Sequence, residues 1–274
     1  MSANTTFATE AELVEAFCAA VATWNANPNR ATAKWTIYPE TAGWDLLLVD
    51  EAGVQIGVEA KLALNAKVIC QALPVATWAD AEGPDYRVVL VPSRSCQLHM
   101  HPIARAVGLT IIEVSKSAIS YDLARVRINP SGLPDEHSGF DWDLRHWFSW
   151  LPTRRCRLPD YVPDVIGGKP SPVALTEWKI KAIKLVVLLD RRGFVTRHDM
   201  KLLGISPTRW TDAFHGFLSP DPIKGGYVRN GRTPDLRGQH PTNYVQIEND
   251  FQTWLPAGTL DLPANDTTPQ ENAA

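Results

Sequence analysis

The sequence has few cysteines and no long apolar segment, and both features narrow the class of protein. Cys18, Cys70, Cys96 and Cys156 form no Cys-x-x-Cys pair. Their spacing suits neither a zinc site nor a small disulfide scaffold, and it favours reduced thiols in a cytoplasmic protein. No stretch of about 18 apolar residues runs without a charge, so no membrane span is expected. Acidic rather than basic residues precede the first apolar stretch, which argues against a signal peptide.

The 274 residues contain enough apolar material for one large domain or two ordinary ones, because 45% of them are hydrophobic. Charge is unevenly distributed between the two halves. Residues 1–120 contain eight Lys/Arg and twelve Asp/Glu, whereas residues 175–250 contain twelve Lys/Arg and eight Asp/Glu. An acidic half joined to a basic half is typical of a catalytic domain that collects metal ions and a domain that holds nucleic acid. Chance imbalance between two solvated domains is the alternative.

The first half predicts one α/β domain over residues 8–120. A helix is expected at 9–24, where apolar residues recur at helical spacing and Thr9 with Glu12 makes a capping box. Further short helices are expected at 62–73 and 102–107. The resulting order of helices and strands predicts an α/β sandwich with a mixed sheet. The strand candidates are residues 34–39, 44–49, 54–60, 86–91 and 109–114.

The rest of the chain divides into three parts. Residues 121–172 contain many prolines and predict an irregular linker, with one short aromatic helix around 141–150. Residues 173–250 predict a smaller domain whose outline is a winged helix-turn-helix. Residues 251–274 predict a tail that is largely disordered at its end. The smaller domain is expected to have helices at 175–190, 194–203 and 206–218 and strands at 226–229 and 243–247.

Two carboxylates and a lysine are the candidate catalytic residues of the first half. Asp45 lies inside the apolar run 44–49, and Glu59 and Lys61 lie at the end of the next strand. Side chains alternate along a strand, so Glu59 and Lys61 share one face, and the hairpin brings Asp45 alongside them. Two carboxylates, with the carbonyl of Ala60 as a further ligand, can hold Mg²⁺ for phosphodiester hydrolysis, and the ammonium can stabilise developing negative charge. Ordinary edge-strand residues with a solvated lysine are the alternative.

At this point the sequence resembles a family. Gly43-Trp44-Asp45, a short hairpin and then Glu59-Ala60-Lys61 look like the PD-(D/E)xK motif of restriction-endonuclease-like nucleases. Trp44 stands where the name of the motif has a proline, a position that is loose in the family. The resemblance covers residues 8–118 and implies a restriction-endonuclease-like mixed-sheet core with Mg²⁺, or Mn²⁺, as cofactor. A fold of this family that has lost its activity is a further alternative.

The resemblance also implies two accessory catalytic residues. The family often places a glutamate from its first helix near the metal, and Glu10 matches that role because it lies on the apolar face of its helix with Leu13 and Phe17. The alternative is a first-turn acid favoured by the helix dipole. Gln71 stands in the helix after Lys61, where related nucleases often place a glutamine. An ordinary exposed helix residue is the alternative there.

The second half predicts a nucleic-acid-binding surface. Ser206 and Pro207 begin the third helix of the smaller domain, and in a helix-turn-helix that helix enters the major groove by its N-terminal residues. Side chains from this helix and from the presumed wing are therefore expected to contact bases and phosphates. A winged helix used for protein contact is the alternative. The candidate nucleic-acid-binding residues are Thr208, Arg209, Thr211, Lys224, Arg229 and Arg232.

The leading hypothesis is a Mg²⁺-dependent DNA endonuclease that a winged helix places on double-stranded DNA. This domain order resembles that of some modification-directed restriction enzymes, which is an analogy of layout only. RNA as substrate stays open, as does a homodimer, because cutting both strands often needs two active centres. Two other classes remain as alternatives. One is a non-catalytic nucleic-acid-binding or regulatory protein with a relic nuclease fold, and the other is an adaptor that binds other proteins.

Overall fold

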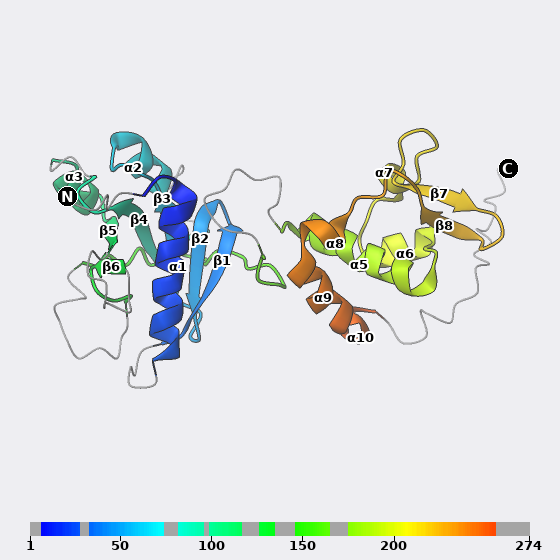
Figure 1. Ribbon diagram of the computed structural model, residues 1–274, viewed down its shortest axis with the longest axis horizontal. Coiled ribbons are helices and arrows are strands. Elements are labelled where there is room, and N and C mark those ends of the chain that lie inside the picture. The colour runs from blue at the N-terminus through cyan, green and yellow to red at the C-terminus, as the bar shows by residue number, and fades with distance from the viewer. Residues whose placement is uncertain are drawn as a thin grey trace. The chain divides into compact units, whose positions relative to one another are not determined.

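The structure is a computed structural model that describes residues 7–27, 33–73, 82–95, 99–116, 126–134, 146–164 and 175–255. The chain divides into two compact units, Met1–Ala174 and Leu175–Ala274, each of which is described by itself (Figure 1). Among the described helices, none has the length and hydrophobicity needed to cross a membrane. The expected tail beyond residue 255 and residues 141–145 of the expected aromatic helix at 141–150 lie outside the described residues. Residues 146–150 are not helical, and Ser149 instead forms a β-bridge with Tyr86, so the helix prediction was wrong for this part.

A six-stranded mixed sheet forms the centre of the first unit, and its strands lie side by side in sequence order. The first three strands are antiparallel to one another, the third, fourth and fifth are parallel, and the sixth returns antiparallel at the edge. All five strands predicted in this half are present, so the prediction of a mixed α/β fold is confirmed. The strands are β1 (Trp35–Thr41), β2 (Trp44–Asp50), β3 (Gln55–Ala60), β4 (Tyr86–Pro92), β5 (Thr110–Lys116) and β6 (Val126–Asn129).

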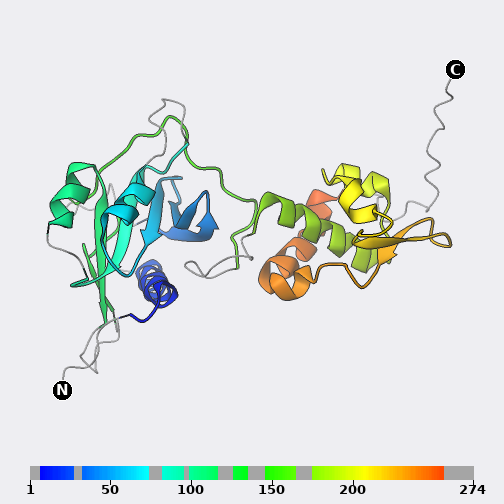
Figure 2. The ribbon, with the colours of Figure 1, turned by 90° about the horizontal axis from the view of Figure 1, so that it is seen from above.

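Helices cover both faces of this sheet, so the unit has three layers (Figure 2). α1 (Glu10–Ala26) packs on one face, where Phe17 and its neighbours are buried against alternate residues of β2, β3 and β4. α2 (Ala66–Ala72) and α3 (Met100–Ala106) pack on the other face. The central strands are therefore apolar on both sides, which is why their sequences are nearly continuous apolar runs.

The β2–β3 hairpin positions the residues of interest. Its turn is fixed by Asp50, whose Oδ1 accepts hydrogen bonds from the N–H groups of Ala52 and Val54, at 2.9 and 2.7 Å. Gly53 supplies the left-handed backbone conformation, with φ of +80°, that the turn requires. The register pairs Leu46 with Val58. One step further along the same register, the start of β2 lies opposite the end of β3.

The stretch expected to be an irregular linker contributes to the first unit. Residues 126–129 form β6 at the edge of the sheet. Further along, the indole of Trp150 donates a hydrogen bond to the carbonyl of Gly108, at 2.8 Å. The backbone N–H of Cys156 donates to Oε1 of Gln55, at 2.8 Å, and Nε2 of Gln55 donates to the carbonyl of Cys156, at 2.9 Å. This stretch therefore packs against the sheet and supplies backbone partners for buried polar groups.

The second unit contains three consecutive helices and a two-stranded hairpin. The first helix begins after the N-cap Thr176 and ends at Gly193, whose φ is +81°, and most of its residues from Ile180 to Leu189 are buried. A β-bridge joins Val195, between the first two helices, to Tyr227 in the second strand of the hairpin. The elements are α5 (Glu177–Arg192), α6 (Arg197–Leu202), α7 (Pro207–Thr211), β7 (Leu218–Asp221), β8 (Gly226–Arg229), α8 (Leu236–Gln239), α9 (Pro241–Asn249) and α10 (Phe251–Trp254).

Two predictions for this unit were wrong. The third helix ends at Thr211 rather than at 218, because β7 begins at Leu218 and pairs with β8. The segment 243–247, predicted as the second strand of the hairpin, is part of α9. Its residues favour strands locally, but Tyr244 and Ile247 are both buried at helical spacing against the rest of the unit, and packing overrides the local preference.

Candidate functional site

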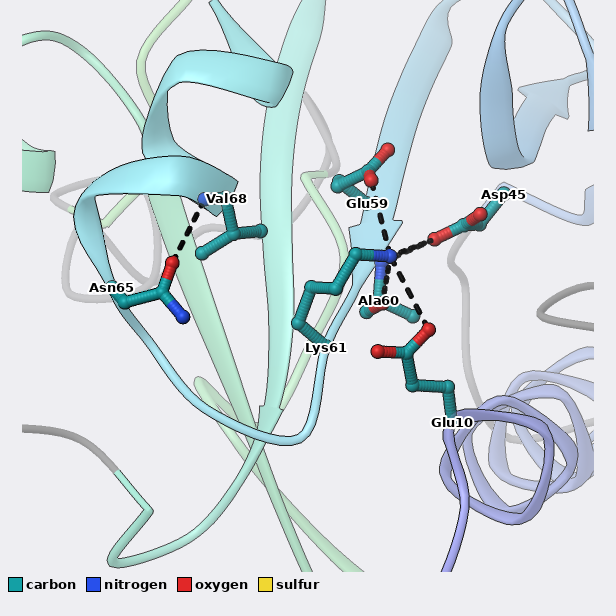
Figure 3. A network of polar contacts seen from close by, with 7 residues as sticks. All are labelled: Glu10, Asp45, Glu59, Ala60, Lys61, Asn65 and Val68. Atoms are coloured by element: carbon teal, nitrogen blue, oxygen red, sulfur yellow. Dashed lines mark hydrogen bonds and ion pairs between the residues drawn. The ribbon is translucent and has the colours of Figure 1, made fainter.

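Four residues meet where β2 begins and β3 ends (Figure 3). Asp45 comes from β2, Glu59 and Ala60 from β3, and Lys61 follows β3 directly. The parallel ladder continues through Lys61, because its N–H donates a hydrogen bond to the carbonyl of Leu90 in β4, at 3.0 Å. The backbone of β3 is therefore paired with β2 and β4 next to the site, and the side chains project from the ends of inner strands.

The ammonium of Lys61 lies at the centre of this group. Its Nζ is 2.8 Å from the carbonyl oxygen of Ala60, to which it donates a hydrogen bond. The same nitrogen is 3.2 Å from Glu59 Oε1, 3.3 Å from Glu10 Oε2 and 3.5 Å from Asp45 Oδ2. Three carboxylates thus surround one ammonium, and the group keeps an excess of two formal negative charges.

The carboxylates differ in their surroundings. Asp45 Oδ2 also accepts a hydrogen bond from the N–H of Ala60, at 2.8 Å, which ties the two strands of the hairpin together. The side chain of Glu59 is only 9% exposed. Burial, and then the nearby charge of Asp45, raise the pKa of Glu59 despite the opposing effect of Lys61. Burial lowers the pKa of Lys61, but the three carboxylates outweigh it and leave that pKa raised.

The two accessory predictions have different outcomes. Glu10, in the first turn of α1, reaches the site through its contact with Lys61. Glu12, in the same turn of α1, forms an ion pair with Lys116 of β5, at 2.6 Å. Gln71 is exposed on α2. Among the described residues, the polar contacts of Lys61 do not include Gln71, so a role for Gln71 at the site stays a prediction.

The donor set at this point fits a hard divalent cation. Within the described part of the chain, no three His, Cys, Asp or Glu side chains are grouped as a ready-made metal site. The oxygens of Asp45, Glu59 and Ala60 instead converge on the Lys61 ammonium. Mg²⁺ takes few protein ligands and keeps several waters, so two carboxylates and a carbonyl are a sufficient set. The excess negative charge favours the same ion.

An arginine that was not singled out from the sequence supports the start of β2. The guanidinium of Arg87, in β4, lies 4.5 Å from the ring centre of Trp150 and 5.7 Å from that of Trp44. It also donates a hydrogen bond to the carbonyl of Ala72 at the end of α2, at 3.1 Å. Arg87 thereby links the residue before Asp45 to a neighbouring helix. A lone arginine inside the apolar run of β4 was the signal in the sequence.

The predicted nucleic-acid-binding residues of the second unit are mostly exposed, and their contacts differ. Arg209 stacks over Trp178 and Phe217, with distances of 5.8 and 5.3 Å to the ring centres. Among the described residues, it has no carboxylate partner. Arg229, by contrast, forms an ion pair with Asp190. The positive charge of Arg209 is therefore less compensated by nearby carboxylates than that of Arg229.

The other predicted residues of this surface make local contacts. Lys224, in the turn of the hairpin, donates a hydrogen bond to the carbonyl of Gly193, at 3.3 Å. Arg232 donates to the carbonyl of Phe214, and Thr211 donates to that of Pro207. Thr208 is exposed at the start of α7. These hydrogen bonds to backbone carbonyls hold the loops beside α7 and the hairpin, and most of these side chains remain exposed.

Comparison of the chain with protein-family models, with curated proteins and with solved structures gave no match.

Proposed function

We propose that this protein is a Mg²⁺-dependent DNA endonuclease of the PD-(D/E)xK type, with Mn²⁺ as an alternative ion. The observation that carries the proposal is the convergence of the oxygens of Asp45, Glu59 and Ala60 on one cationic centre at the ends of two inner strands of a mixed sheet. Three acidic residues, two from different strands and one from a helix, contact the same nitrogen, which favours an assembled site over ordinary strand residues.

Each residue has a distinct role in this proposal. Asp45, Glu59 and the Ala60 carbonyl hold the ion, and the hydrogen bond from the Ala60 N–H keeps Asp45 in place. The chemistry supplied by a bound ion is polarisation of the phosphate and a lower pKa for an attacking water. Lys61 stabilises the negative charge that develops on the phosphate oxygens.

The arrangement of elements supports the same assignment. The helix α1 precedes an antiparallel hairpin that supplies both halves of the motif, and two parallel strands, β4 and β5, follow through helical crossovers. This is the order that the resemblance implies for a restriction-endonuclease-like core. The strand ends that carry Asp45 and Glu59 lie together because of the hairpin register, so the motif is assembled by the fold.

The second unit is proposed to be a winged helix that places the nuclease on duplex DNA. Three helices followed by the β7–β8 hairpin support this reading, as does the isolated β-bridge that ties Val195 to Tyr227 of the hairpin. Arg209 on α7 and Lys224 in the hairpin turn are positioned for phosphate or base contacts in that reading. The guanidinium of Arg209 stacks on aromatic rings and has no carboxylate partner within the described part of the chain, which makes Arg209 the strongest candidate for a base contact.

A plasmid cleavage assay with Mg²⁺ or Mn²⁺ tests the proposal. We expect nicking or linearisation by the parent protein and a loss of about a hundredfold or more in Glu59→Ala and Lys61→Ala. Glu51→Ala and Lys67→Ala are matched controls, because both residues are exposed and lie outside the site, and they should cut like the parent. Circular dichroism establishes that each variant is folded.

The assay separates the alternatives. Cleavage that persists in both Glu59→Ala and Lys61→Ala would contradict the assignment of the site. No cleavage of plain, methylated or branched DNA, together with salt-dependent DNA binding, would identify a non-catalytic nucleic-acid-binding protein. Neither cleavage nor DNA binding at low salt would favour the adaptor alternative.

A further inference from the structure

One cation already occupies the centre of the proposed site, and it belongs to the protein. The Lys61 ammonium contacts the same oxygens of Asp45, Glu59 and Ala60 that are proposed to hold a divalent ion (Figure 3). Two cations cannot share this position, because like charges a few ångströms apart repel strongly. Lys61 must therefore leave these oxygens before they bind a divalent ion.

Glu10 is the carboxylate best placed to keep the ammonium when it leaves. It comes from α1, whereas Asp45 and Glu59 come from the hairpin. Asp45 is fixed by the Ala60 N–H and Glu59 is almost fully buried, but the side chain of Glu10 is 36% exposed. Its Oε2 is already 3.3 Å from Lys61 Nζ. A small swing of the lysine toward α1 would keep this contact and release the other oxygens.

We propose that Lys61 is an internal counter-cation that holds the carboxylates together before a divalent ion binds, and that Glu10 is a positioning residue that retains Lys61 afterwards. This inference rests on the proposed function of the site. In this arrangement Glu10 acts on ion binding through Lys61, not as a ligand of the ion. The lysine then stays within reach of the phosphate, which is where its proposed role requires it.

The two roles for Glu10 predict opposite couplings with Lys61. If Glu10 retains the displaced lysine, Glu10→Gln leaves Lys61 with only the ion-binding oxygens, so the loss of ion affinity is larger when Lys61 is present. If Glu10 is itself a ligand, Lys61 competes for it, and the loss is larger when Lys61 is absent. Any through-space attraction between Glu10 and the ion is common to both backgrounds and cancels in the double-mutant cycle.

The experiment measures the dissociation constant of Mn²⁺ by titration calorimetry, without DNA, in the full chain. The variants are Glu10→Gln, Lys61→Met and the double variant. We expect Lys61→Met to bind Mn²⁺ about tenfold more tightly or better, since it removes the competing charge. We expect Glu10→Gln to weaken binding by about threefold to tenfold beside Lys61, and by clearly less in the Lys61→Met background.

A matched control comes from the same turn of α1. Glu12 is also acidic, but it pairs with Lys116, so Glu12→Gln should leave Mn²⁺ affinity within about twofold of the parent. Thermal unfolding of every variant establishes that the comparison is made between folded proteins. A change in Glu12→Gln as large as that in Glu10→Gln would overturn the inference, because a general charge effect of the helix would then explain both.

The other outcomes are equally decisive. If Glu10→Gln weakens Mn²⁺ binding more in the Lys61→Met background than beside Lys61, Glu10 is a ligand of the ion and its positioning role is refuted. Unchanged or weaker binding in Lys61→Met would refute the counter-cation role, while leaving the nuclease proposal intact if the parent binds Mn²⁺ and cuts DNA. A parent that binds no Mn²⁺ would contradict the metal-dependent function itself, and with it this inference.

Discussion

Gly57 is the position where a single added carbon should disturb the candidate site most directly. It lies in the middle of β3, and the ring of Trp44 lies directly over it. A Cβ on Gly57 would overlap that ring and would come within 2.9 Å of Pro84 Cγ. Trp44 immediately precedes Asp45, so the ring cannot move without affecting the start of β2. We therefore expect Gly57→Ala to lower both stability and activity.

The size of the effect follows from the cost of overpacking a well-filled region. Inserting one carbon where the neighbours cannot yield costs about 1–3 kcal/mol. Trp44 also contacts the guanidinium of Arg87, and β3 is buried along its whole length, so the upper part of that range is expected. In a unit of this size, 1 kcal/mol corresponds to about 2–4 °C in the melting temperature.

Thermal and denaturant unfolding of Gly57→Ala, with plasmid cleavage alongside, would test this reasoning. Gly231→Ala is the control, because nothing lies within 4 Å of a Cβ there and the backbone is unstrained. Adding Trp44→Leu to Gly57→Ala should make the combined loss smaller than the sum of the single losses, since the smaller side chain removes the overlap. Additive losses, or a Gly57→Ala variant as stable as Gly231→Ala, would refute the steric explanation.

Three further predictions follow from single contacts. Because the pKa of Glu59 is raised in the folded state, metal-free protein should lose stability as pH rises from about 4 through the folded-state pKa, and unfolding of Glu59→Gln should show less of this loss. Tyr244→Phe removes the hydrogen bond to Asp190 Oδ2, 2.6 Å long, and should cost about 1–3 kcal/mol in denaturant unfolding. In DNA-binding titrations at several salt concentrations, Arg209→Ala should lower DNA affinity and reduce the slope of log affinity against log salt by about 1. Arg229→Ala should change that slope little and should mainly lower stability in denaturant unfolding, because Arg229 pairs with Asp190.

The central sheet could be predicted because its strands carry strong, simple patterns. β4 and β5 are short apolar runs, and β2 and β3 are two such runs separated by a turn. β6 was not predicted because it is four residues long and lies at an edge, where only one neighbour constrains its sequence. Because β6 has a neighbouring strand on one side only, its sequence contains few apolar residues, and the strand becomes evident only in the assembled sheet.

The hairpin of the second unit was misplaced because its local sequence preferences contradict the structure. β7 has the sequence Leu-Ser-Pro-Asp, and both proline and aspartate are unfavourable in strands. It forms because β8 pairs with it and because a two-stranded ribbon tolerates proline where no ladder donor is needed. The segment 243–247 has better strand formers, yet its buried residues face α5 and α8 from a helix. For such short elements, the strand preference of the residues predicts the structure poorly, because pairing and packing with other elements determine it.

The candidate site was predictable to the extent that it depends on the backbone. The hairpin sets Asp45 opposite Glu59, and strand alternation sets Lys61 on the same face as Glu59, so spacing brought these three residues together. The place of Glu10 near the site came from the resemblance as well as from the helical face of α1. The position of the Lys61 ammonium at the centre of three carboxylates depends on side-chain torsions and on the balance of charge, which spacing does not give. The position of Gln71 on the surface of α2 was likewise beyond the reach of sequence spacing.

The same balance of charge explains why this cluster sits at the end of a strongly buried hairpin. Three carboxylates around one ammonium repel one another, and burial of Glu59 adds to the cost of keeping it ionised. A flexible loop would relax by separating these groups. The hairpin cannot, since both of its strands are paired and packed on two faces, and the Ala60 N–H holds Asp45 in place. The apolar packing of the sheet therefore maintains an uncompensated negative charge, and that charge is what a divalent ion would neutralise.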